Sequence, residues 1–322
     1  MNSFGTYVTK RIISSVFSIF LISIAVFLLV HLLPGDPVRA MLGSDADEAA
    51  VRATQKMLNL DKPLVTQYII WLKGVLHGDF GRSLVLNTNI SELLVARIPV
   101  SLSITLPAFF IASMIGIVIG VISAIRRGSA VDQSLTVLTT TLSGIPDFWI
   151  GIMMIFVFGV YLHVLPTMGY VSPIEDFGGY LRCATLPVSV LTLVSIADVA
   201  RQMRTNMLDV LNQDYIRTAK ANGLSAFSIR YKHALKNTLI PIITLMVIQV
   251  RSLVGGSLLI EQIFSIAGMG RLIYTSVMNK DYLTIQALVF IISIIVIFCN
   301  LLLDISYGLI DPRVRIASGE DR

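Results

Sequence analysis

Charged side chains are scarce in this sequence. Asp, Glu, Lys and Arg make up 14% of its 322 residues, whereas about a quarter of an ordinary soluble domain is charged. Hydrophobic residues account for 55% of the chain, and its mean hydropathy is +0.78. This composition excludes an ordinary soluble protein and predicts a polytopic membrane protein.

Several chemical signatures are also missing. The two cysteines, Cys183 and Cys299, lie in or beside apolar runs and form no metal-binding or redox spacing, so no metal site is predicted. No HExxH, GxSxG or paired-carboxylate arrangement indicates an enzyme. No G-x-x-x-x-G-K-[ST] phosphate loop is present, because GDFGRS lacks the Lys, and the chain is therefore not expected to hydrolyse ATP. The net charge of +5 comes without a basic patch interleaved with aromatic residues, so nucleic acid is not an expected partner.

Long apolar runs dominate what is present. A helix needs about 20 apolar residues to cross a bilayer, and six runs meet or nearly meet that length. The first is too long for a cleaved signal and no small-x-small site follows it, while the third contains Pro146-Asp147 and is expected to kink there. The sequence therefore predicts an all-α fold with six transmembrane helices, over residues 12–33, 100–125, 134–165, 183–200, 238–260 and 284–310.

Short basic segments predict the orientation of these helices. If the six helices alternate, the basic residues at 10–11, 126–127, 201–236 and 313–315 all fall on one side of the membrane. Loops rich in Lys and Arg stay in the cytoplasm. Both termini are then cytoplasmic. The predicted parts are the N-terminus and first helix (1–33), an extracytoplasmic cap (34–98), a five-helix core (99–310) with a cytoplasmic segment (201–237), and a cytoplasmic tail (311–322).

The cap is expected to contain two helices. Ser44 is a suitable N-cap for a first helix running through Leu58, and Asp47 would strengthen its start. A second helix would end near Gly78, and its apolar stripe is formed by Leu64, Tyr68, Leu72 and Val75.

The cytoplasmic segment is the most distinctive part of the chain. Between positions 201 and 236 there are seven Lys or Arg residues and only two acidic residues, Asp209 and Asp214. Asp214 suits the positive start of a helix, and Asn222-Gly223 supplies the left-handed residue that ends it. A second short helix would follow, with an apolar face of Phe227, Tyr231, Ala234 and Leu235. From its chemistry alone, this segment is either a pair of helices lying in the membrane interface or a surface that another protein grips.

The sequence of this segment resembles a known family. DYIRTAKANGL and KHALKNTLIP are similar to the coupling segment of membrane subunits in ATP-binding-cassette importers, in the branch that handles dipeptides, oligopeptides, glutathione and nickel. Further matches along the chain are HLLPGDPV, LHGDFGRSL, AIRRGSAVD, LPTMGY, VGGSLLIEQIF with GMGRL, and DPRVR. The chain departs from the broader superfamily, whose Glu-Ala-Ala is replaced here by Arg217, Thr218 and Ala219, and no proline occupies positions 233–236.

This resemblance implies a type I importer permease in a bacterial inner membrane. The chain would bind no cofactor itself, since ATP and Mg²⁺ would be used by two separate ATPase subunits. Its other partners would be a second, similar permease subunit, an extracytoplasmic solute-binding protein and the lipid bilayer. Peptide is the first choice of solute, with nickel or metal chelates and glutathione as alternatives. Phe227 and Tyr231 would anchor the coupling segment against the membrane helices, and the residues expected to meet the ATPase are Asp214, Arg217, Ala219, Lys220, Gly223, Leu224 and Phe227.

Ionisable residues inside the membrane are the candidates for lining a pore, because burying them costs roughly 2.5–3.5 kcal/mol each. Arg251, within the fifth run, could attract a substrate carboxylate, and the resemblance implies a small residue at that position in relatives. Asp147 at the expected kink and Asp198 near Arg201 are weaker candidates. All three could instead be structural. An ion-coupled carrier is the competing class, but it would need midplane titratable groups and inverted repeats that the sequence does not clearly show.

Overall fold

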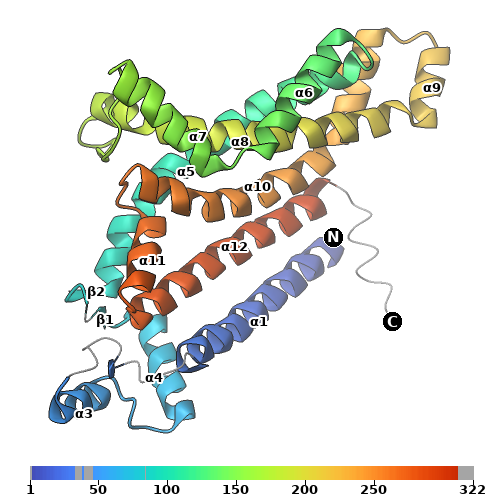
Figure 1. The fold of residues 1–322 in the computed structure, drawn as a ribbon. Helices are drawn as coiled ribbons and strands as arrows, with labels where there is room; N and C mark the ends of the chain where they lie inside the picture. The colour runs from blue at the N-terminus through green and yellow to red at the C-terminus, as the bar shows by residue number, and fades with distance from the viewer. Residues whose placement is uncertain (1, 33–37, 40–45, 84, 311–322) are drawn as a thin grey trace. The chain divides into compact units, whose positions relative to one another are not determined.

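The computed structural model describes residues 2–32, 38–39, 46–83 and 85–310 (Figure 1). The side chains of some residues within helices, Arg251 among them, lie outside this description. Almost every described element is a helix. The exception is a short hairpin, in which β1 (Arg82–Ser83) pairs antiparallel with β2 (Thr88–Asn89).

Among the described residues, four helices are long and apolar enough to cross a membrane. The predicted fifth run lies in α10 (Leu235–Ile263). The third run forms α6 (Ala130–Gly144), α7 (Asp147–Met154) and the π-helix η1 (Ile155–Tyr161). The all-α membrane class is therefore confirmed, and most of the described residues in each predicted run are helical. The four long helices are α1 (Asn2–Leu32), α5 (Ile90–Ile125), α8 (Phe177–Leu211) and α12 (Tyr282–Ile310).

The third run is broken far more sharply than a kink. The helix axes before and after the break differ by 95°. Pro146 has no N–H to donate and pushes the preceding residue out of the helical region. Ile145 accordingly is extended, with φ −96° and ψ 128°, so α6 ends at Gly144 and α7 begins anew at Asp147.

The chain forms two compact units. The first comprises Met1–Arg11, Leu102–Ile266 and Cys299–Arg322, and the second comprises Ile12–Ser101 and Ala267–Phe298. In the first unit, α8 packs against α6, α7 and α10. The helices α5 and α8 approach closely because Gly116 and Gly120 carry no side chain there. A Cβ at Gly120 would lie 2.6 Å from the carbonyl oxygen of Ala200. Such a G-x-x-x-G spacing brings two membrane helices into backbone contact.

The second unit contains the residues expected to form the cap. α3 spans Glu48–Met57 and follows Asp47, while the proposed N-cap Ser44 lies outside the described residues. α4 spans Leu64–Leu76, and three of its four stripe residues are half-buried, although Leu64 at its first position is exposed. Tyr68 shares a 2.8 Å hydrogen bond with Ser23 of α1. The apolar stripe therefore packs on the helices of its own unit.

α5 begins at Ile90, well before the predicted start at residue 100. Ile90 and Leu94 are buried in the core of the second unit, together with Met269 and Leu272 of α11 (Met269–Met278). Arg97 donates a 2.8 Å hydrogen bond to the carbonyl of Ala267. The search for long apolar runs did not include this first part of the helix, because it is amphipathic and carries charges.

Candidate functional site

The predicted coupling segment forms a short helix with a well-defined end. α9 spans Asp214–Ala221, with Asp214 in its first turn. The backbone N–H of Leu224 donates to the carbonyl of Ala219 over 3.2 Å, and that of Gly223 donates to Lys220 over 3.1 Å. This pair of bonds is a Schellman motif, which needs a left-handed residue after the helix. Gly223 has φ +81°, so the predicted helix end is confirmed.

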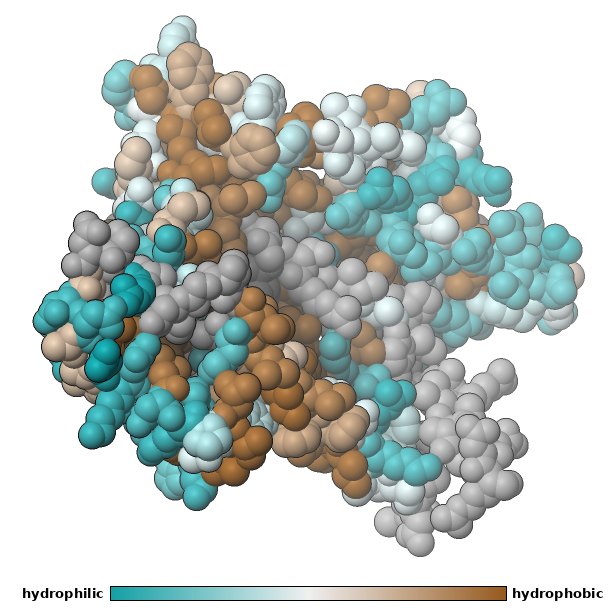
Figure 2. All heavy atoms as spheres, turned by 60° about the horizontal axis from the view of Figure 1, so that its bottom comes forward, coloured by the Kyte–Doolittle hydropathy of each residue, from teal (hydrophilic) through white to brown (hydrophobic). Residues whose placement is uncertain are grey.

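One face of α9 is packed and the other is free. Ile216 is buried in a core with Met203 and Met207 of α8, and Ala219 packs half-buried against the same core. Asn237 of α10 donates a 2.7 Å hydrogen bond to the hydroxyl of Tyr215. Figure 2 shows hydrophilic surface gathered at the right-hand edge, the side on which Figure 1 places α9. The exposed residues among those expected to meet the ATPase are Asp214, Arg217, Lys220, Gly223, Leu224 and Phe227.

The chain after Gly223 differs from the prediction of a second, separate helix. Residues 226–227 are helical, the π-helix η2 (Ser228–Ala234) follows, and α10 continues from it without a break. π-Helical bonds run from residue i to residue i+5. Residues five apart therefore share a face, and Ile229 and Ala234 are the pair that is buried.

This change of register overturns one expected role. Phe227 is 72% exposed and Tyr231 is 45% exposed, so they do not anchor the segment against the helices of this chain. Their rings instead lie together on the surface, with centroids 4.7 Å apart. Ile229 and Ala234 provide the anchor, because they belong to the core that also holds Ile216.

The three pore candidates lie on three different helices. Asp147 is the first residue of α7, and its carboxylate accepts a 2.8 Å hydrogen bond from the backbone N–H of Phe148. Asp198 is exposed on α8 and pairs with Arg201 on the same face of that helix. Arg251 lies in α10, and its side chain is outside the described residues.

Sequence reasoning missed an ion pair that joins the end of α8 to a buried carboxylate at the start of α6. Arg204 of α8 donates through Nε to Asp132 Oδ1 over 2.7 Å and through Nη2 to Asp132 Oδ2 over 2.9 Å. The same carboxylate accepts bonds from the Ser123 hydroxyl at 2.5 Å and the Gly128 N–H at 2.9 Å. The side chain of Asp132 is only 5% exposed. The two residues are 72 positions apart, and the available signal was that Asp132 ends the motif AIRRGSAVD.

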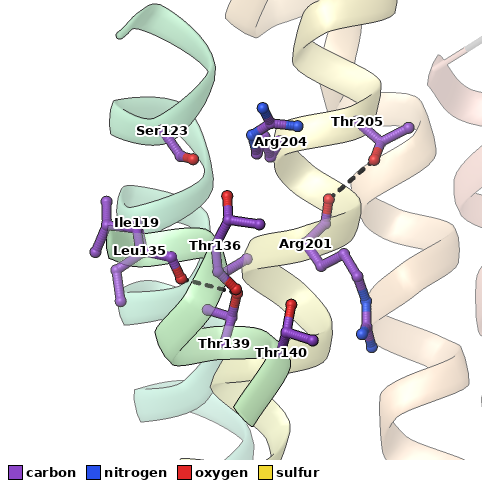
Figure 3. A pocket seen from close by; sticks show the side chains of 10 residues that line it. Ile119, Ser123, Leu135, Thr136, Thr139, Thr140, Arg201, Arg204 and Thr205 are labelled. Carbon is purple, nitrogen blue, oxygen red and sulfur yellow. Dashed lines mark hydrogen bonds between the residues drawn. The ribbon is translucent and has the colours of Figure 1, made fainter. Parts of the chain in front are cut away.

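A small cavity of about 60 Å³ lies next to this pair, between α5, α6 and α8 (Figure 3). Figure 3 shows Arg204 and Arg201 pointing in different directions from α8. Apolar side chains, those of Ile119, Leu135 and Ala200, and five hydroxyl-bearing side chains line the cavity. The hydroxyl groups belong to Ser123 of α5, to Thr136, Thr139 and Thr140 of α6, and to Thr205 of α8.

Comparison with known proteins shows the family to which this chain belongs. Residues 116–316 match the model of the binding-protein-dependent transport system inner membrane component, and residues 5–105 match the model of the corresponding N-terminal region. A putative peptide transport system permease protein of Brucella abortus is 37% identical over 308 residues, which cover 96% of this chain and 98% of that protein. The oligopeptide transport system permease protein AppB of Bacillus subtilis is 37% identical over 313 residues, covering 96% and 99% respectively.

Among solved structures, the MetNI methionine ABC transporter in an inward-facing conformation is similar in fold. The TM-score is 0.57 at 18% sequence identity, and the match covers 68% of this chain and 96% of that one. The type I importer permease fold is thereby confirmed. With both family models matched over most of its length, the chain belongs to the family of binding-protein-dependent transport system inner membrane components.

Proposed function

We propose that this chain forms half of the translocation pathway of an ATP-driven importer for di- or oligopeptides. The observation that carries the proposal is the near full-length similarity to proteins named as peptide and oligopeptide permeases. A probable peptide ABC transporter permease protein of Sinorhizobium fredii, 35% identical over 311 residues, adds a third example. Nickel chelates and glutathione, the alternative solutes, are not favoured by these relatives.

The proposed motor contact is α9 with the turn at Gly223. Ile216 holds the buried face of α9 in a core that also contains residues of α8 and α10. A force on the exposed face of α9 would therefore be passed to those two helices. The sequence contains no phosphate loop of its own. A separate ATPase subunit, using ATP and Mg²⁺, would receive this tip in a cleft.

The remaining partners follow from the same proposal. Two ATPase subunits, a second similar permease and an extracytoplasmic solute-binding protein would complete the complex. The chain would lie in a bacterial inner membrane with both termini in the cytoplasm. Exposed apolar side chains on the membrane helices suit contact with lipid. Examples are Ile13, Val16 and Phe17 of α1, which are 63%, 60% and 59% exposed.

The pathway itself is proposed to include Arg251 and Asp198. A charge on a membrane-crossing helix is stable only where it meets water, another charge or a partner chain. Asp198 and Arg201 are both more than half exposed on α8 and pair with each other. Asp147 is the weakest of the three candidates, since its carboxylate already accepts the backbone N–H of Phe148 in the first turn of α7.

The proposal is tested by reconstituting the permease with its second permease, both ATPase subunits and its binding protein in liposomes. Radiolabelled di-, tri- and pentapeptides are offered outside, with ATP supplied on the ATPase side. We expect uptake that requires ATP and the binding protein. Uptake of labelled nickel chelate or glutathione in place of every peptide would overturn the peptide assignment. Peptide uptake driven by a proton gradient without ATP would overturn the importer class.

Contact with the ATPase has its own measurement. A cysteine at exposed Leu224 should cross-link to the ATPase subunit in the assembled complex. The matched control is a cysteine at Val85, which is equally exposed at 39% but lies in the segment expected to face outward. Cross-linking from Val85 and not from Leu224 would reject α9 as the docking element.

A further inference from the structure

We propose that the Asp132–Arg204 pair is a positioning contact that transmits movement of α9 and the end of α8 to α6. This inference rests on the proposed function, and it assigns the pair a part in coupling ATP hydrolysis to opening of the pathway. The geometry that supports it is a single buried carboxylate that holds together elements far apart in the sequence.

The hydrogen bonds of Asp132 reach three other segments. Both of its oxygens accept from Arg204 of α8, one also accepts from Ser123 near the end of α5, and the other from Gly128 in the α5–α6 turn. Asp132 itself lies in the first turn of α6, which Ser129 caps. A bidentate guanidinium–carboxylate pair fixes direction as well as distance. The start of α6 is thus held at a defined angle to α8.

Arg204 is placed where a force from α9 would arrive. Its neighbour Met203, and Met207 one turn later, are fully buried in the core that contains Ile216 of α9 and Ile229 of η2. Arg204 is seven residues from the end of α8 at Leu211, or about 10 Å along the helix axis. The end of α8 and α9 therefore form one packed body, and Arg204 is its polar contact with α6.

The interface beside the pair is incompletely filled, and both apolar side chains, such as Leu135, and hydroxyl groups line the space. The cavity of about 60 Å³ separates the hydroxyl-bearing face of α6 from α8 at this point (Figure 3). Apolar groups across a void lose their mutual contacts. α6 and α8 also pack directly on each other, and beside this cavity the ion pair adds a directional connection between the two helices.

Movement of α6 would be passed on to α7. α6 continues through the 95° bend at Pro146 into α7, and α7 packs against α8 and α10. A rotation of the α8 end, transmitted through Arg204 to the start of α6, would shift this bend relative to α10. The pair is suited to this task because its buried carboxylate accepts four hydrogen bonds, and such a satisfied polar network rigidifies the structure around it.

Removing one partner alone leaves an unpaired buried charge, which can prevent folding. The decisive variant is therefore the double change Asp132→Asn with Arg204→Met, which removes both charges and preserves bulk. The reconstituted complex is measured for peptide taken up per ATP hydrolysed. Coupling residues change linked equilibria by about tenfold, so we expect that ratio to fall on the order of tenfold while complex assembly and nucleotide binding persist. Arg204→Lys keeps the charge but loses the bidentate geometry. Its ratio of peptide taken up to ATP hydrolysed should lie between those of the wild type and the double variant.

The matched control is another arginine–aspartate pair between helices of the same unit. Arg11 of α1 contacts Asp304 of α12 at 3.2 Å, and neither residue touches the coupling segment's core. Arg11→Met with Asp304→Asn should leave the uptake-to-hydrolysis ratio unchanged. An equal fall in this control would show a general effect of removing ion pairs and would overturn the proposal.

A second readout separates coupling from stability. Thr140, exposed on the cavity wall of α6, is changed to Cys in a background with Cys183→Ser and Cys299→Ser. Its labelling by a thiol reagent should differ between the nucleotide-free and vanadate-trapped complex. That difference should vanish in the Asp132→Asn/Arg204→Met variant although trapping still occurs.

The outcomes are distinguishable. An unchanged ratio and an unchanged labelling difference in the double variant would reject the coupling role alone. Failure of the double variant to assemble would assign the pair to stability and also reject it. Absence of ATP-dependent peptide uptake by the wild-type complex would instead reject the proposed function on which the inference rests.

Discussion

Leu224 and Ala219 are joined by a 3.2 Å backbone hydrogen bond that closes α9 over Gly223. The bond fixes the exit direction of the chain, so the exposed side chain of Leu224 is presented beside the helix tip. The turn is possible because Gly223 adopts φ +81°. A Cβ at this position would meet no atom within 4 Å, and the constraint is therefore conformational rather than steric.

The first prediction tests this conformation. Gly223→Val should abolish uptake and weaken ATPase association while the protein stays in the membrane, because a left-handed conformation costs an ordinary residue roughly 1–2 kcal/mol. Gly223→Asn is the control, since Asn tolerates that conformation. The Gly223→Asn variant should retain most of the peptide uptake and most of the association with the ATPase. The measurements are co-purification of the ATPase and peptide uptake. Full transport by the Val variant, or equal loss in both variants, would argue against a conformational requirement.

The second prediction concerns the contact of α5 with α8. In Gly120→Ala the added Cβ would lie 2.6 Å from both the Ala200 carbonyl and the Met203 Cβ. Overpacking of this kind costs about 1–3 kcal/mol, so the apparent melting temperature of the purified complex in detergent should fall.

Gly144→Ala is the matched control for that change. It adds the same methyl group to a helical glycine whose Cβ would meet nothing within 4 Å. Its melting temperature should be unchanged or slightly higher, because Ala is favoured over Gly in helices by up to about 1 kcal/mol. A fall in both variants would point to a general intolerance of alanine and not to the α5–α8 contact.

Local features of this fold were predictable from the sequence, and non-local ones were not. The apolar runs located the membrane helices, and Asn222-Gly223 located the end of α9, because both signals act over a few residues. The sharpness of the bend at Pro146 could not be predicted. Proline ends a helix, but the direction of the next helix also depends on contacts with distant parts of the chain, and α7, after its 95° bend, packs on α8 and α10.

The errors in the candidate site have two causes. The expected anchor of Phe227 and Tyr231 assumed regular helical spacing, whereas the π register of η2 turns Ile229 and Ala234 inward. The pairing of Asp132 with Arg204 spans 72 residues and leaves no periodic pattern in the sequence. Only the folded chain brings these two residues together.

The third prediction concerns orientation. A cysteine introduced at Ser225, which is exposed beside the Gly223 turn, should resist an impermeant thiol reagent in intact cells, because basic segments face the cytoplasm. A cysteine at Leu86, which is 44% exposed in the hairpin, should react. Leu86 is preferable to neighbouring Asn87, whose φ of 53° would strain the replacement.

This labelling experiment uses a background in which Cys183 and Cys299 are replaced by Ser. Permeabilised cells provide the control, since both introduced cysteines should react there. The reverse pattern in intact cells, with Ser225→Cys labelled and Leu86→Cys protected, would overturn the proposed topology.

The last prediction concerns Arg251, which lies within α10. If its guanidinium attracts the carboxylate of a passing peptide, Arg251→Met should slow translocation without changing capture, because capture occurs on the separate binding protein. Methionine keeps length and removes charge. Uptake and ATP hydrolysis by the reconstituted complex are compared for a peptide with a free C-terminal carboxylate and for its amidated form. Uptake of the free acid should fall by more than uptake of the amide, since only the free acid has the charge to lose. An equal fall for both peptides, or loss of subunit assembly, would assign Arg251 to structure.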